Sequence, residues 1–264
     1  MPLTDSHCHL DFSPLGDDTT SLSNTLQACL NADIKRLIVP AVSPDNWSSV
    51  LKLTQQDAAS IKILTCLGIH PWYLNERDNK SLDGLGKVVA ENFDIIVGIG
   101  ETGIDGNIAE RENNLAKQIS FFEYHLSLAQ QYQLPLIIHH YKAHQQVTQM
   151  LNKVKPEKAG IIHGFSGSFQ QAKQYIDLGF KLGIGGTITY ERAKKTINTV
   201  KKLPLDSIVI ETDAPSMPLS GKQGLPNHPK YLTNIFNVLC SLRTEPKDLI
   251  AHQLEVNINT VFNA

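Results

Sequence analysis

The sequence predicts an α/β protein that folds as a single barrel of eight parallel strands alternating with helices, over residues 1–264. Eight short apolar runs with strand character recur along the chain, and segments with helical spacing lie between them. The length of 264 residues is in the range of one (β/α)8 domain. Because β-α units of this kind form parallel sheets, and eight of them close naturally, we predict a TIM barrel.

The expected strands are the apolar runs Pro2–Thr4, Leu37–Pro40, Ile63–Leu67, Ile95–Ile99, Leu136–Ile138, Ala159–Ile162, Phe180–Ile184 and Ile208–Ile210. The clearest helix has apolar residues that step by four and three, as a buried stripe should. They are Leu115, Ile119, Phe122, Leu126 and Ala129. This helix should close over Gln131–Leu134, because Pro135 cannot continue it. Two more helices are expected between Lys230 and Phe262, with Pro246 in the first turn of the second.

The composition is that of a globular chain, with 41% hydrophobic and 19% charged residues. No apolar run approaches the roughly 20 residues that a membrane span needs, and no basic and then apolar signal region precedes Asp5. We therefore expect a cytoplasmic protein without membrane contact.

The four cysteines are scattered without C-x-x-C spacing, which predicts reduced thiols instead of a disulfide framework or a zinc knuckle.

The net charge of −2 argues against a protein that grips long duplex nucleic acid by charge alone. A substrate with phosphate groups is compatible with this charge if metal ions supply the positive field. Lys194, Lys195, Lys201 and Lys202 form a dense basic stretch, but apolar residues interleave them, which indicates a solvated helix face.

The stretch Asp5-Ser6-His7-Cys8-His9 follows the first expected strand. Residues i and i+2 of an extended chain point to the same face, so His7 and His9 project together while Cys8 points away. Two imidazoles placed in this way can chelate a metal ion, although ordinary surface or core histidines also occur at this spacing.

Five other expected strands lead into a possible metal ligand. The carboxyl ends of barrel strands meet at one rim, so residues far apart in the sequence converge there. Any one of them alone would more often be a hydrogen-bonded core group, but the joint pattern indicates a metal site. The residues are His70, Glu101, His139, His163 and Asp213, the last in the run Glu211-Thr212-Asp213.

Imidazole and carboxylate ligands without thiolates suit zinc, manganese, nickel or magnesium. Four histidines and two acids exceed what one tetrahedral ion uses, so we predict two divalent metal ions. Such ions, about 3.5–4 Å apart, activate a water as hydroxide and stabilise the attacking and leaving oxygens. We expect Glu101 to bridge the ions, with His7, His9 and Asp213 at the first and His139 and His163 at the second.

Three glycine-containing motifs have other interpretations. Gly98-x-Gly100-x-x-Gly103 formally matches a dinucleotide fingerprint, but Glu101 within it would place negative charge against a pyrophosphate. The run from Gly164 to Ser168 is similar to a nucleophile elbow with a displaced glycine, so Ser166 is a turn residue or a substrate contact. The Gly183–Gly186 loop with Thr187 either seats a phosphate or is a plain tight turn.

With these residues assembled, the chain resembles the TatD family of metal-dependent deoxyribonucleases, and within it the YjjV-like branch. The matching stretches run nearly from end to end: residues 5–9, 68–71, 100–105, 138–139, 163–168, 185–190, 211–215 and 226–229, and Asn257 with Phe262. The resemblance implies a TIM-barrel hydrolase of the amidohydrolase-like superfamily. It also implies a divalent metal pair bound by His7, His9, Glu101, His139, His163 and Asp213.

The resemblance further implies cleavage of phosphodiester bonds, often as a 3′–5′ exonuclease on single-stranded DNA. The expected catalytic residues are Glu101, Asp213 as a proton acceptor, and His70 near the scissile phosphate.

We expect the protein to act as a monomer. The loop from Ala214 to Pro229 follows the last strand, where barrel enzymes often keep substrate-handling parts. Expected substrate contacts are His70, Lys142, Ser166, Thr187 and Asn227.

The chain departs from the family pattern two residues after His139. The family usually has an Arg there, whereas this chain has Tyr141 followed by Lys142, and neither reproduces the two parallel hydrogen bonds of a guanidinium to phosphate. This departure motivates an alternative, a metal-dependent deacylase or esterase acting on an aminoacyl-tRNA or on a small acyl or phosphate substrate.

A second departure is at Trp72, where many relatives have a second His. This indole could stack on a base or simply pack at the rim.

A third hypothesis is a metal-binding or scaffold protein whose barrel has lost catalysis. The complete set of expected ligands weighs against it, because acidic ligands around an open rim normally mark a site for exchangeable water.

Overall fold

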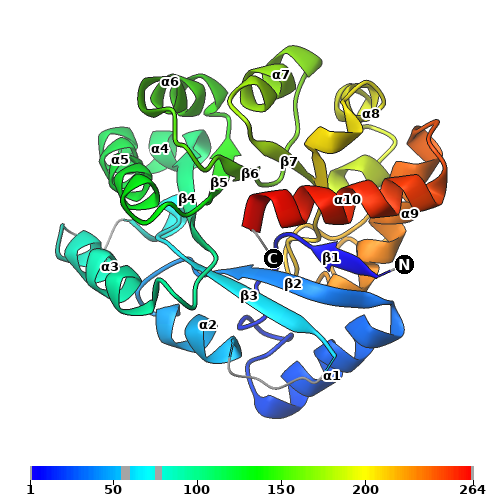
Figure 1. The fold of residues 1–264 in the computed structure, drawn as a ribbon, viewed down its shortest axis with the longest axis horizontal. Coiled ribbons are helices and arrows are strands. Elements are labelled where there is room, and N and C mark those ends of the chain that lie inside the picture. Colours follow the sequence, from blue (N-terminus) through cyan, green and yellow to red (C-terminus); the bar gives the residue numbers. More distant parts are fainter. Residues whose placement is uncertain (1, 55–59, 75–78, 263–264) are drawn as a thin grey trace.

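The computed structural model describes residues 2–54, 60–74 and 79–262. Its strands form one parallel sheet in the order of the sequence (Figure 1). The backbone N–H of Ser6, after the first strand, donates to the carbonyl of Ile210 in the last at 3.0 Å, so the sheet curls into a near-closed barrel and the predicted fold is confirmed. The strands are β1 (Leu3–Asp5), β2 (Ile34–Pro40), β3 (Lys62–Leu67), β4 (Gly98–Asp105), β5 (Leu136–Tyr141), β6 (Gly160–Ile162), β7 (Lys181–Ile184) and β8 (Ile208–Ile210).

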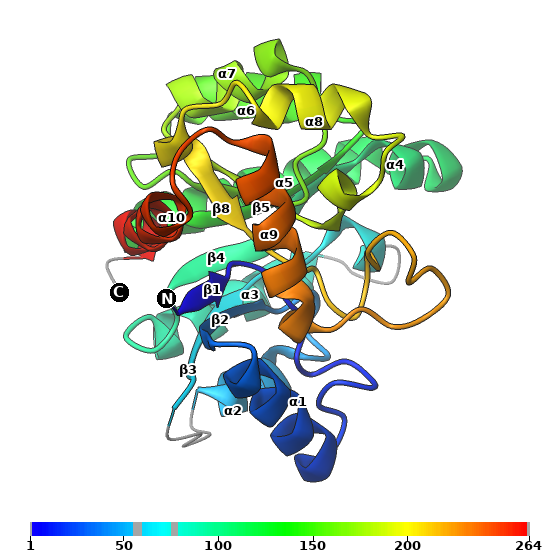
Figure 2. The same cartoon turned by 90° about the vertical axis from the view of Figure 1, so that its right-hand side faces the viewer.

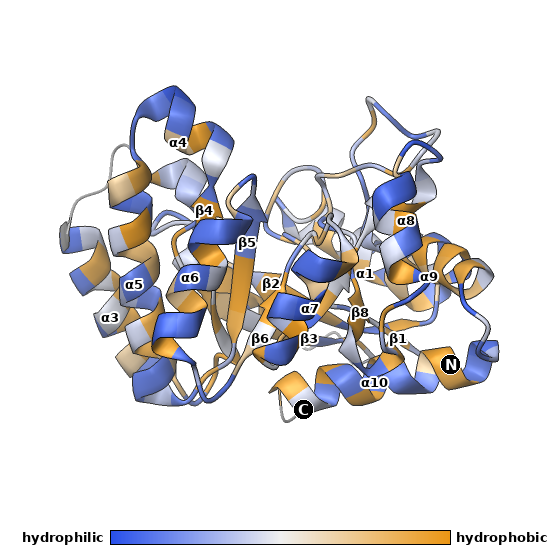
Figure 3. Cartoon of the chain, turned by 90° about the horizontal axis from the view of Figure 1, so that it is seen from above, coloured by the Kyte–Doolittle hydropathy of each residue, from blue (hydrophilic) through white to orange (hydrophobic). Residues whose placement is uncertain are grey.

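Helices form the outer layer and turn their apolar faces toward the strands (Figures 2 and 3). They are α1 (Thr19–Asn31), α2 (Trp47–Leu53), α3 (Asn79–Asn92), α4 (Gly106–Glu112), α5 (Leu115–Tyr132), α6 (His144–Val154), α7 (Phe169–Asp177), α8 (Lys194–Val200), α9 (Leu232–Leu242) and α10 (Lys247–Phe262). Short 3-10 helices are η1 (Pro71–Tyr73), η2 (Gly186–Thr189), η3 (Leu205–Ser207) and η4 (Pro229–Tyr231). Within the described ranges, no helix is both long and apolar enough to cross a membrane.

The fourth strand does not lie where the sequence pattern placed it. The prediction was Ile95–Ile99, but β4 runs from Gly98 to Asp105. The N–H groups of Ile95 and Ile96 donate to the carbonyl of Asn92 in the last turn of α3, and the Ile95 side chain is 47% exposed. Glu101 therefore lies inside a strand and not at its end, and the strand continues to Asp105.

The helix predicted from the stripe that includes Phe122, Leu126 and Ala129 is confirmed as α5, and these three side chains are buried. Its first residue, Leu115, is 36% exposed. The helix ends at Tyr132, and the C-cap residue Gln133 has a left-handed φ of 53°. Pro246 lies just before α10 instead of in its first turn, and its carbonyl accepts the N–H of Ile250.

The end of the barrel opposite α4 is closed by α10 (Figure 3). Here Glu255 of α10 accepts hydrogen bonds from Thr4 Oγ1 at 2.9 Å and from Arg36 Nη2 at 2.7 Å, which join the helix to β1 and β2. A buried apolar cluster joins α10 to residues of five strands. Its members include Ile38, Leu64, Ile137, Ile161, Val209, Ile258, Val261 and Phe262.

Candidate metal centre

Three strands contribute an apolar residue to the cluster beneath α10. Two residues later, in the strand or directly after it, each has a polar residue at the opposite end of the barrel. Alternate residues of a strand face the same side, so each polar residue continues the inward row that begins with the apolar one. The pairs are Ile137 and His139 in β5, Ile161 and His163 at β6, and Val209 and Glu211 at β8. The barrel interior is therefore apolar near α10 and polar at the carboxyl ends of the strands.

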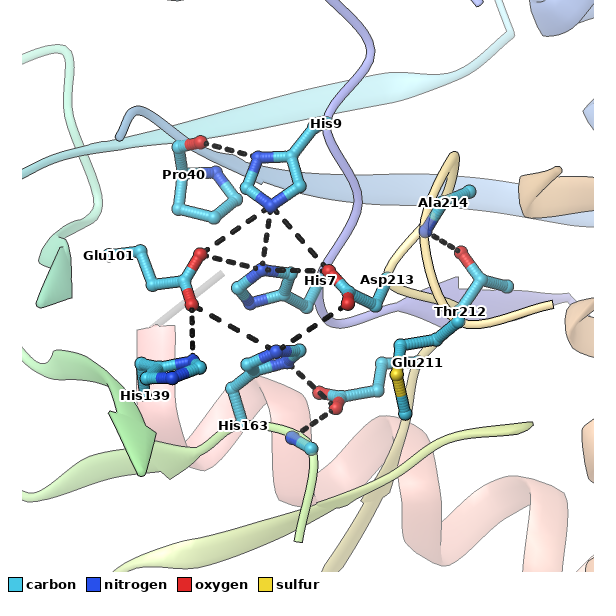
Figure 4. Close-up of polar contacts among 12 residues, drawn as sticks. His7, His9, Pro40, Glu101, His139, His163, Glu211, Thr212, Asp213 and Ala214 are labelled. Atoms are coloured by element: carbon cyan, nitrogen blue, oxygen red, sulfur yellow. Dashed lines mark hydrogen bonds and ion pairs between the residues drawn. The ribbon is translucent and has the colours of Figure 1, made fainter. Parts of the chain in front are cut away.

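Glu101 lies at the centre of the polar end, with its two oxygens turned toward different histidines (Figure 4). Its Oε2 is 3.2 Å from His7 Nε2 and 3.5 Å from His9 Nε2. Its Oε1 is 3.3 Å from His139 Nδ1 and 3.9 Å from His163 Nε2. One carboxylate therefore joins the two groups of histidines that the sequence assigned to two ions.

Asp213 faces the same centre from the end of β8. Its Oδ1 is 3.6 Å from Nε2 of both His7 and His9, and its Oδ2 is 3.9 Å from His163 Nε2. The backbone of Asp213 has a left-handed φ of 56°, and its N–H donates to the carbonyl of His7 at 2.9 Å. The side chain is 16% exposed, whereas that of Glu101 is 3% exposed, so Asp213 is the more accessible of these two carboxylates.

The buried carboxyl group of Asp5 links the ends of β1 and β8. It accepts hydrogen bonds from the backbone N–H groups of His7 and Thr212 and from the Thr212 hydroxyl, the last at 2.6 Å. Burial raises the pKa of Asp5 to about 8, although the Thr212 bonds oppose that rise. Asp5 thus holds the backbones that carry His7 and Asp213.

In each of three histidines, one ring nitrogen faces an oxygen atom that can accept a hydrogen bond, and the other ring nitrogen is left free for the centre. His9 Nδ1 lies 3.2 Å from the carbonyl oxygen of Pro40, so Nε2 faces inward. His163 Nδ1 lies 2.9 Å from Glu211 Oε1. His139 is reversed: its Nε2 lies 3.2 Å from Asp105 Oδ2, and Nδ1 faces Glu101. His7 Nδ1 has no hydrogen-bond partner among the described residues.

Asp105, Glu211 and Asp5 are the site residues that sequence reasoning did not assign. Glu211 is fully buried and also accepts the backbone N–H of Gly164 through Oε1. A signal was present: Glu211 is two residues before Asp213, and Asp105 is four after Glu101, so each shares an inward row with an expected ligand. That signal does not say which histidine each acid contacts.

His70 also reaches Glu101, with Nε2 at 3.3 Å from Oε1. Its Nδ1 accepts the backbone N–H of Trp72 at 3.1 Å, so the hydrogen of the neutral ring is on Nε2. Burial is the main cause that lowers the pKa of His70, to about 4. The side chain therefore presents a neutral N–H donor to the centre.

Burial and neighbouring charges act in opposite directions on the ionisation of the centre. Burial raises the pKa of Glu101, but His70 and His7 outweigh it and hold that pKa well below its usual value. Burial lowers the pKa of His9, but Asp213 and Glu101 raise it to about 10. The pKa of His163 is raised to about 10 as well, because Glu211 and Asp213 outweigh burial.

These residues fit a pair of divalent ions. The Nε2 atoms of His7 and His9 are 3.2 Å apart, a distance at which two lone pairs repel unless a proton or a cation lies between them. Two groups with ligand atoms within 4.8 Å of one another share Glu101: one adds His7 and His9, the other His70 and His139. The second group differs from the expected one, which had His163. A third group contains His7, His163 and Glu211.

Four expected substrate contacts lie around this centre in different settings. Lys142 is exposed after β5, with Nζ 5.7 Å from the centroid of the Tyr141 ring. Ser166 is exposed, and its hydroxyl lies 3.1 Å from that of Thr196. Thr187 is half-buried in η2. Asn227 is buried, and its amide donates to the carbonyls of Thr212 and Met217, so it anchors the 214–229 loop.

Comparisons with known proteins agree with a metal centre. The sequence pattern of the TatD related DNase family matches residues 4–263. The chain is 40% identical to YjjV of Escherichia coli K12, described as an uncharacterized metal-dependent hydrolase, over 260 residues that cover 98% of this chain and 97% of YjjV. It is 38% identical over 268 residues to an uncharacterized metal-dependent hydrolase of Haemophilus influenzae, with both chains fully covered.

Solved structures share the fold. The crystal structure of the Escherichia coli TatD homologue YjjV superposes with a TM-score of 0.92 at 39% identity, covering 99% of this chain and 98% of that one. A phosphotriesterase homology protein of Escherichia coli, solved with phosphate in its active site, superposes with a TM-score of 0.66 at 14% identity, covering 98% and 95%. At that identity the likeness concerns the barrel alone.

Proposed function

The chain belongs to the TatD family of metal-dependent hydrolases, and from this premise we propose that it is a phosphodiesterase, a deoxyribonuclease that shortens single-stranded DNA from the 3′ end. The observation that carries the proposal is the position of Glu101 between two groups of histidines. A carboxylate with each oxygen turned to a different group is the natural bridge of a two-metal site. Two-metal sites are typical of enzymes that cleave phosphate esters.

We propose that the first ion is held by His7, His9, Asp213 and Glu101, and the second by Glu101, His139 and His163. Zinc, manganese, nickel and magnesium all fit nitrogen and oxygen donors without thiolates. Divalent ions bound there would make a water molecule more acidic and would stabilise charge on the attacking and leaving oxygens. The protein residues supply position and proton transfer around that chemistry.

Asp213 is the proposed proton acceptor. Burial raises its pKa, but His163 and His9 outweigh this and hold the pKa below its usual value, so the carboxylate is ready to accept a proton. Its partial exposure places it where a water molecule can reach it. Glu101 is almost fully buried and faces four histidines, which suits a bridging ligand better than a proton acceptor.

His70 is the proposed donor to the substrate. Its Nε2–H points into the centre, and the Trp72 N–H at Nδ1 prevents the ring from exchanging its tautomer. In a complex this N–H would turn from Glu101 to a phosphate oxygen and stabilise the negative charge that develops there. We propose Lys142, Ser166 and Thr187 as further contacts along the rim.

A second candidate is a metal-dependent deacylase or esterase acting on an aminoacyl-tRNA or on a small acyl or phosphate substrate. Tyr141 favours it, because this residue is 48% exposed at the end of β5, where the family usually has an arginine. A phenol cannot grip phosphate with two parallel charged hydrogen bonds. Assays on single-stranded DNA, on aminoacyl-tRNA and on small acyl and phosphate esters separate the two candidates. The first predicts cleavage of the internucleotide phosphodiester bonds of DNA, and the second predicts turnover of the tRNA or of the small esters without DNA cleavage.

The test of the first candidate combines metal analysis with DNA cleavage. Protein purified without chelator should contain about two divalent ions per chain and should shorten 5′-labelled single-stranded DNA stepwise from its 3′ end. Glu101→Gln should lose turnover and bound metal while keeping its fold. Glu110→Gln, an exposed position on α4, is the matched control and should behave as the unmodified protein. Full cleavage by Glu101→Gln would overturn the proposal.

We also propose that the protein is a cytoplasmic monomer. All the proposed ligands come from one chain, so the centre does not need a second subunit. Cys8, Cys29, Cys66 and Cys240 are free thiols, as expected in a reducing compartment. Gel filtration at micromolar concentration tests the oligomeric state.

A further inference from the structure

Trp72 is unusual among the large side chains of the protein because it is 58% exposed. The other tryptophan of the chain, Trp47, is 7% exposed and donates its indole N–H to the carbonyl of Gly68. Trp72 lies in η1, two residues after His70, and thus on the rim beside the metal centre. A large apolar ring left open at this place needs a physical explanation.

The exposed indole is held in one orientation. Its Nε1–H donates to Asp105 Oδ2 at 2.7 Å, and its ring lies edge-on to His70 with centroids 5.5 Å apart. Pro71, which begins η1, is buried and anchors the backbone. Because the polar edge of the indole is bonded, a ligand meets a preorganised apolar surface. Binding to it costs less conformational entropy than binding to a mobile side chain.

The same Asp105 oxygen connects the indole to the metal centre. Oδ2 accepts from Trp72 Nε1 and also lies 3.2 Å from His139 Nε2, and the opposite nitrogen of His139 faces Glu101. The indole is therefore two hydrogen bonds away from a proposed metal ligand. A group that rests on this ring would be next to the bond that the centre cleaves.

A second exposed aromatic residue stands near Asp105. Tyr141 is the partner of Asp105 in the register of β4 and β5, and it follows His139 by two residues, so it belongs to the inward row of β5. It is 48% exposed, and Lys142 Nζ lies 5.7 Å from the centroid of its ring. The rim on this side of the centre thus combines two aromatic rings with a cation.

We propose that Trp72 is a stacking platform for an unpaired base of the substrate, positioned beside the scissile phosphodiester, with Tyr141 and Lys142 completing this subsite. The inference rests on the proposed function and adds the substrate feature that the site selects. Flat aromatic rings next to a cation bind single-stranded nucleic acids because every base has a π face and every linkage a negative charge. A base in a duplex has its faces covered by neighbouring pairs, so the platform favours a frayed or single-stranded end.

Binding of short oligonucleotides tests the platform separately from cleavage. The probes are a fluorescein-labelled hexathymidylate with phosphorothioate linkages and the same molecule with its 3′-terminal base removed. Both are titrated against the metal-loaded protein and followed by fluorescence anisotropy. Stacking of one base changes affinity by about five-fold to one-hundred-fold, so the unmodified protein should prefer the intact probe by a factor in this range.

Two substitutions distinguish stacking from support of the metal centre. Trp72→Leu removes the aromatic face, and should abolish the preference for the intact probe while leaving the affinity for the abasic probe unchanged. Trp72→Phe keeps a ring but loses the bond to Asp105, and should retain most of the preference. Phe93→Leu is the matched control, because Phe93 is a 53% exposed aromatic residue that contacts Tyr132, away from the centre.

Several results would overturn the platform. They are equal affinity of the unmodified protein for the two probes, no binding of the intact probe, or equal loss of metal from Trp72→Phe and Trp72→Leu, which would make Trp72 a support for Asp105.

Failure of the nuclease proposal gives different results from failure of the platform. If the protein prefers the intact probe but cleaves no phosphodiester, the platform stands and the reaction is another one. If it cleaves intact and abasic DNA with the same KM, the nuclease stands and the platform falls.

Discussion

Nδ1 of His163 lies 2.9 Å from Oε1 of Glu211, a carboxylate that is fully buried behind the metal centre (Figure 4). A negative charge this close favours a hydrogen on Nδ1, which leaves Nε2 of His163 for the centre. Contacts of this kind keep a histidine ligand oriented and increase its basicity. Glu211 therefore acts on the centre through His163.

Glu211→Gln should weaken metal binding by about 10-fold to 100-fold, because an amide holds the imidazole less firmly than a carboxylate. Titration with a fluorescent metal chelator as competitor measures the change. Glu191→Gln, an exposed position, is the control and should leave affinity unchanged. An unaltered affinity in Glu211→Gln would show that His163 does not depend on this contact.

Gly183→Ala should disturb the same contact from another strand. A methyl group at residue 183 would lie 2.1 Å from Glu211 Oε2, so the buried carboxylate must move. We expect a loss of metal affinity comparable with that of Glu211→Gln, together with a loss of stability of about 1–3 kcal/mol from overpacking. Gly84→Ala in α3 meets no atom closer than 3.7 Å, and should instead stabilise by up to about 1 kcal/mol. Thermal unfolding followed by circular dichroism compares the two.

Asp105→Asn should affect the second ion more than the first. Asp105 lies against His139 but not against His7 or His9, so the expected result is a fall in metal content from about two ions per chain toward about one. The N-terminus of α4 should persist, because an asparagine oxygen can still accept the N–H groups of Asn107 and Ile108 that Asp105 now binds. Elemental analysis after gel filtration gives the count. Exposed Asp83→Asn should keep both ions.

Metal-free protein should lose stability as the pH rises from about 6.5 toward 10. The folded pKa values of His9 and His163 are about 10, above the ordinary 6.5, so their charged contacts stabilise the fold fully below pH 6.5 and are lost as these groups deprotonate. Asp5, with a pKa of about 8, acts in the same direction. The melting temperature of chelator-treated protein between pH 6.5 and 9.5 measures this fall, and an increase would contradict it.

Added metal should protect more strongly at the upper end of that range. Metal ions bind imidazoles only after the protons leave, so the apparent affinity rises with pH. The difference in melting temperature between metal-loaded and chelator-treated protein should therefore widen from pH 6.5 to 9.5. A constant difference would mean that protons and metal do not compete at these histidines.

Ile258→Ala should destabilise the fold by about 2–5 kcal/mol, because this residue is 1% exposed in the cluster between α10 and the strands. Metal content should remain normal, since the cluster lies at the opposite end of the barrel from Glu101. Val256→Ala, on the same helix but 37% exposed, should change stability by less than about 0.5 kcal/mol. Urea unfolding of the three proteins provides the comparison.

The pattern of apolar runs was enough to predict the barrel, because short apolar strands alternating with helices have few other ways to bury both faces of a sheet. It also located the polar rim, since a barrel brings all strand ends to one side. The error at the fourth strand has a local cause. Ile95 and Ile96 are as apolar as a strand, but their N–H groups close the last turn of α3 instead.

The sequence by itself determined the kinds of donor atom at the centre and the end of the barrel where they meet, because alternation along a strand and parallel direction between strands are properties of the chain. Only the tertiary structure decided which acid contacts which imidazole. Which residues of adjacent strands lie side by side depends on the register of strand pairing. In β4 that register shifts between Ile99 and Thr102, and this places Glu101 among the histidines and Asp105 against His139. The same packing buries Asn227 in its loop and leaves the indole of Trp72 open on the rim.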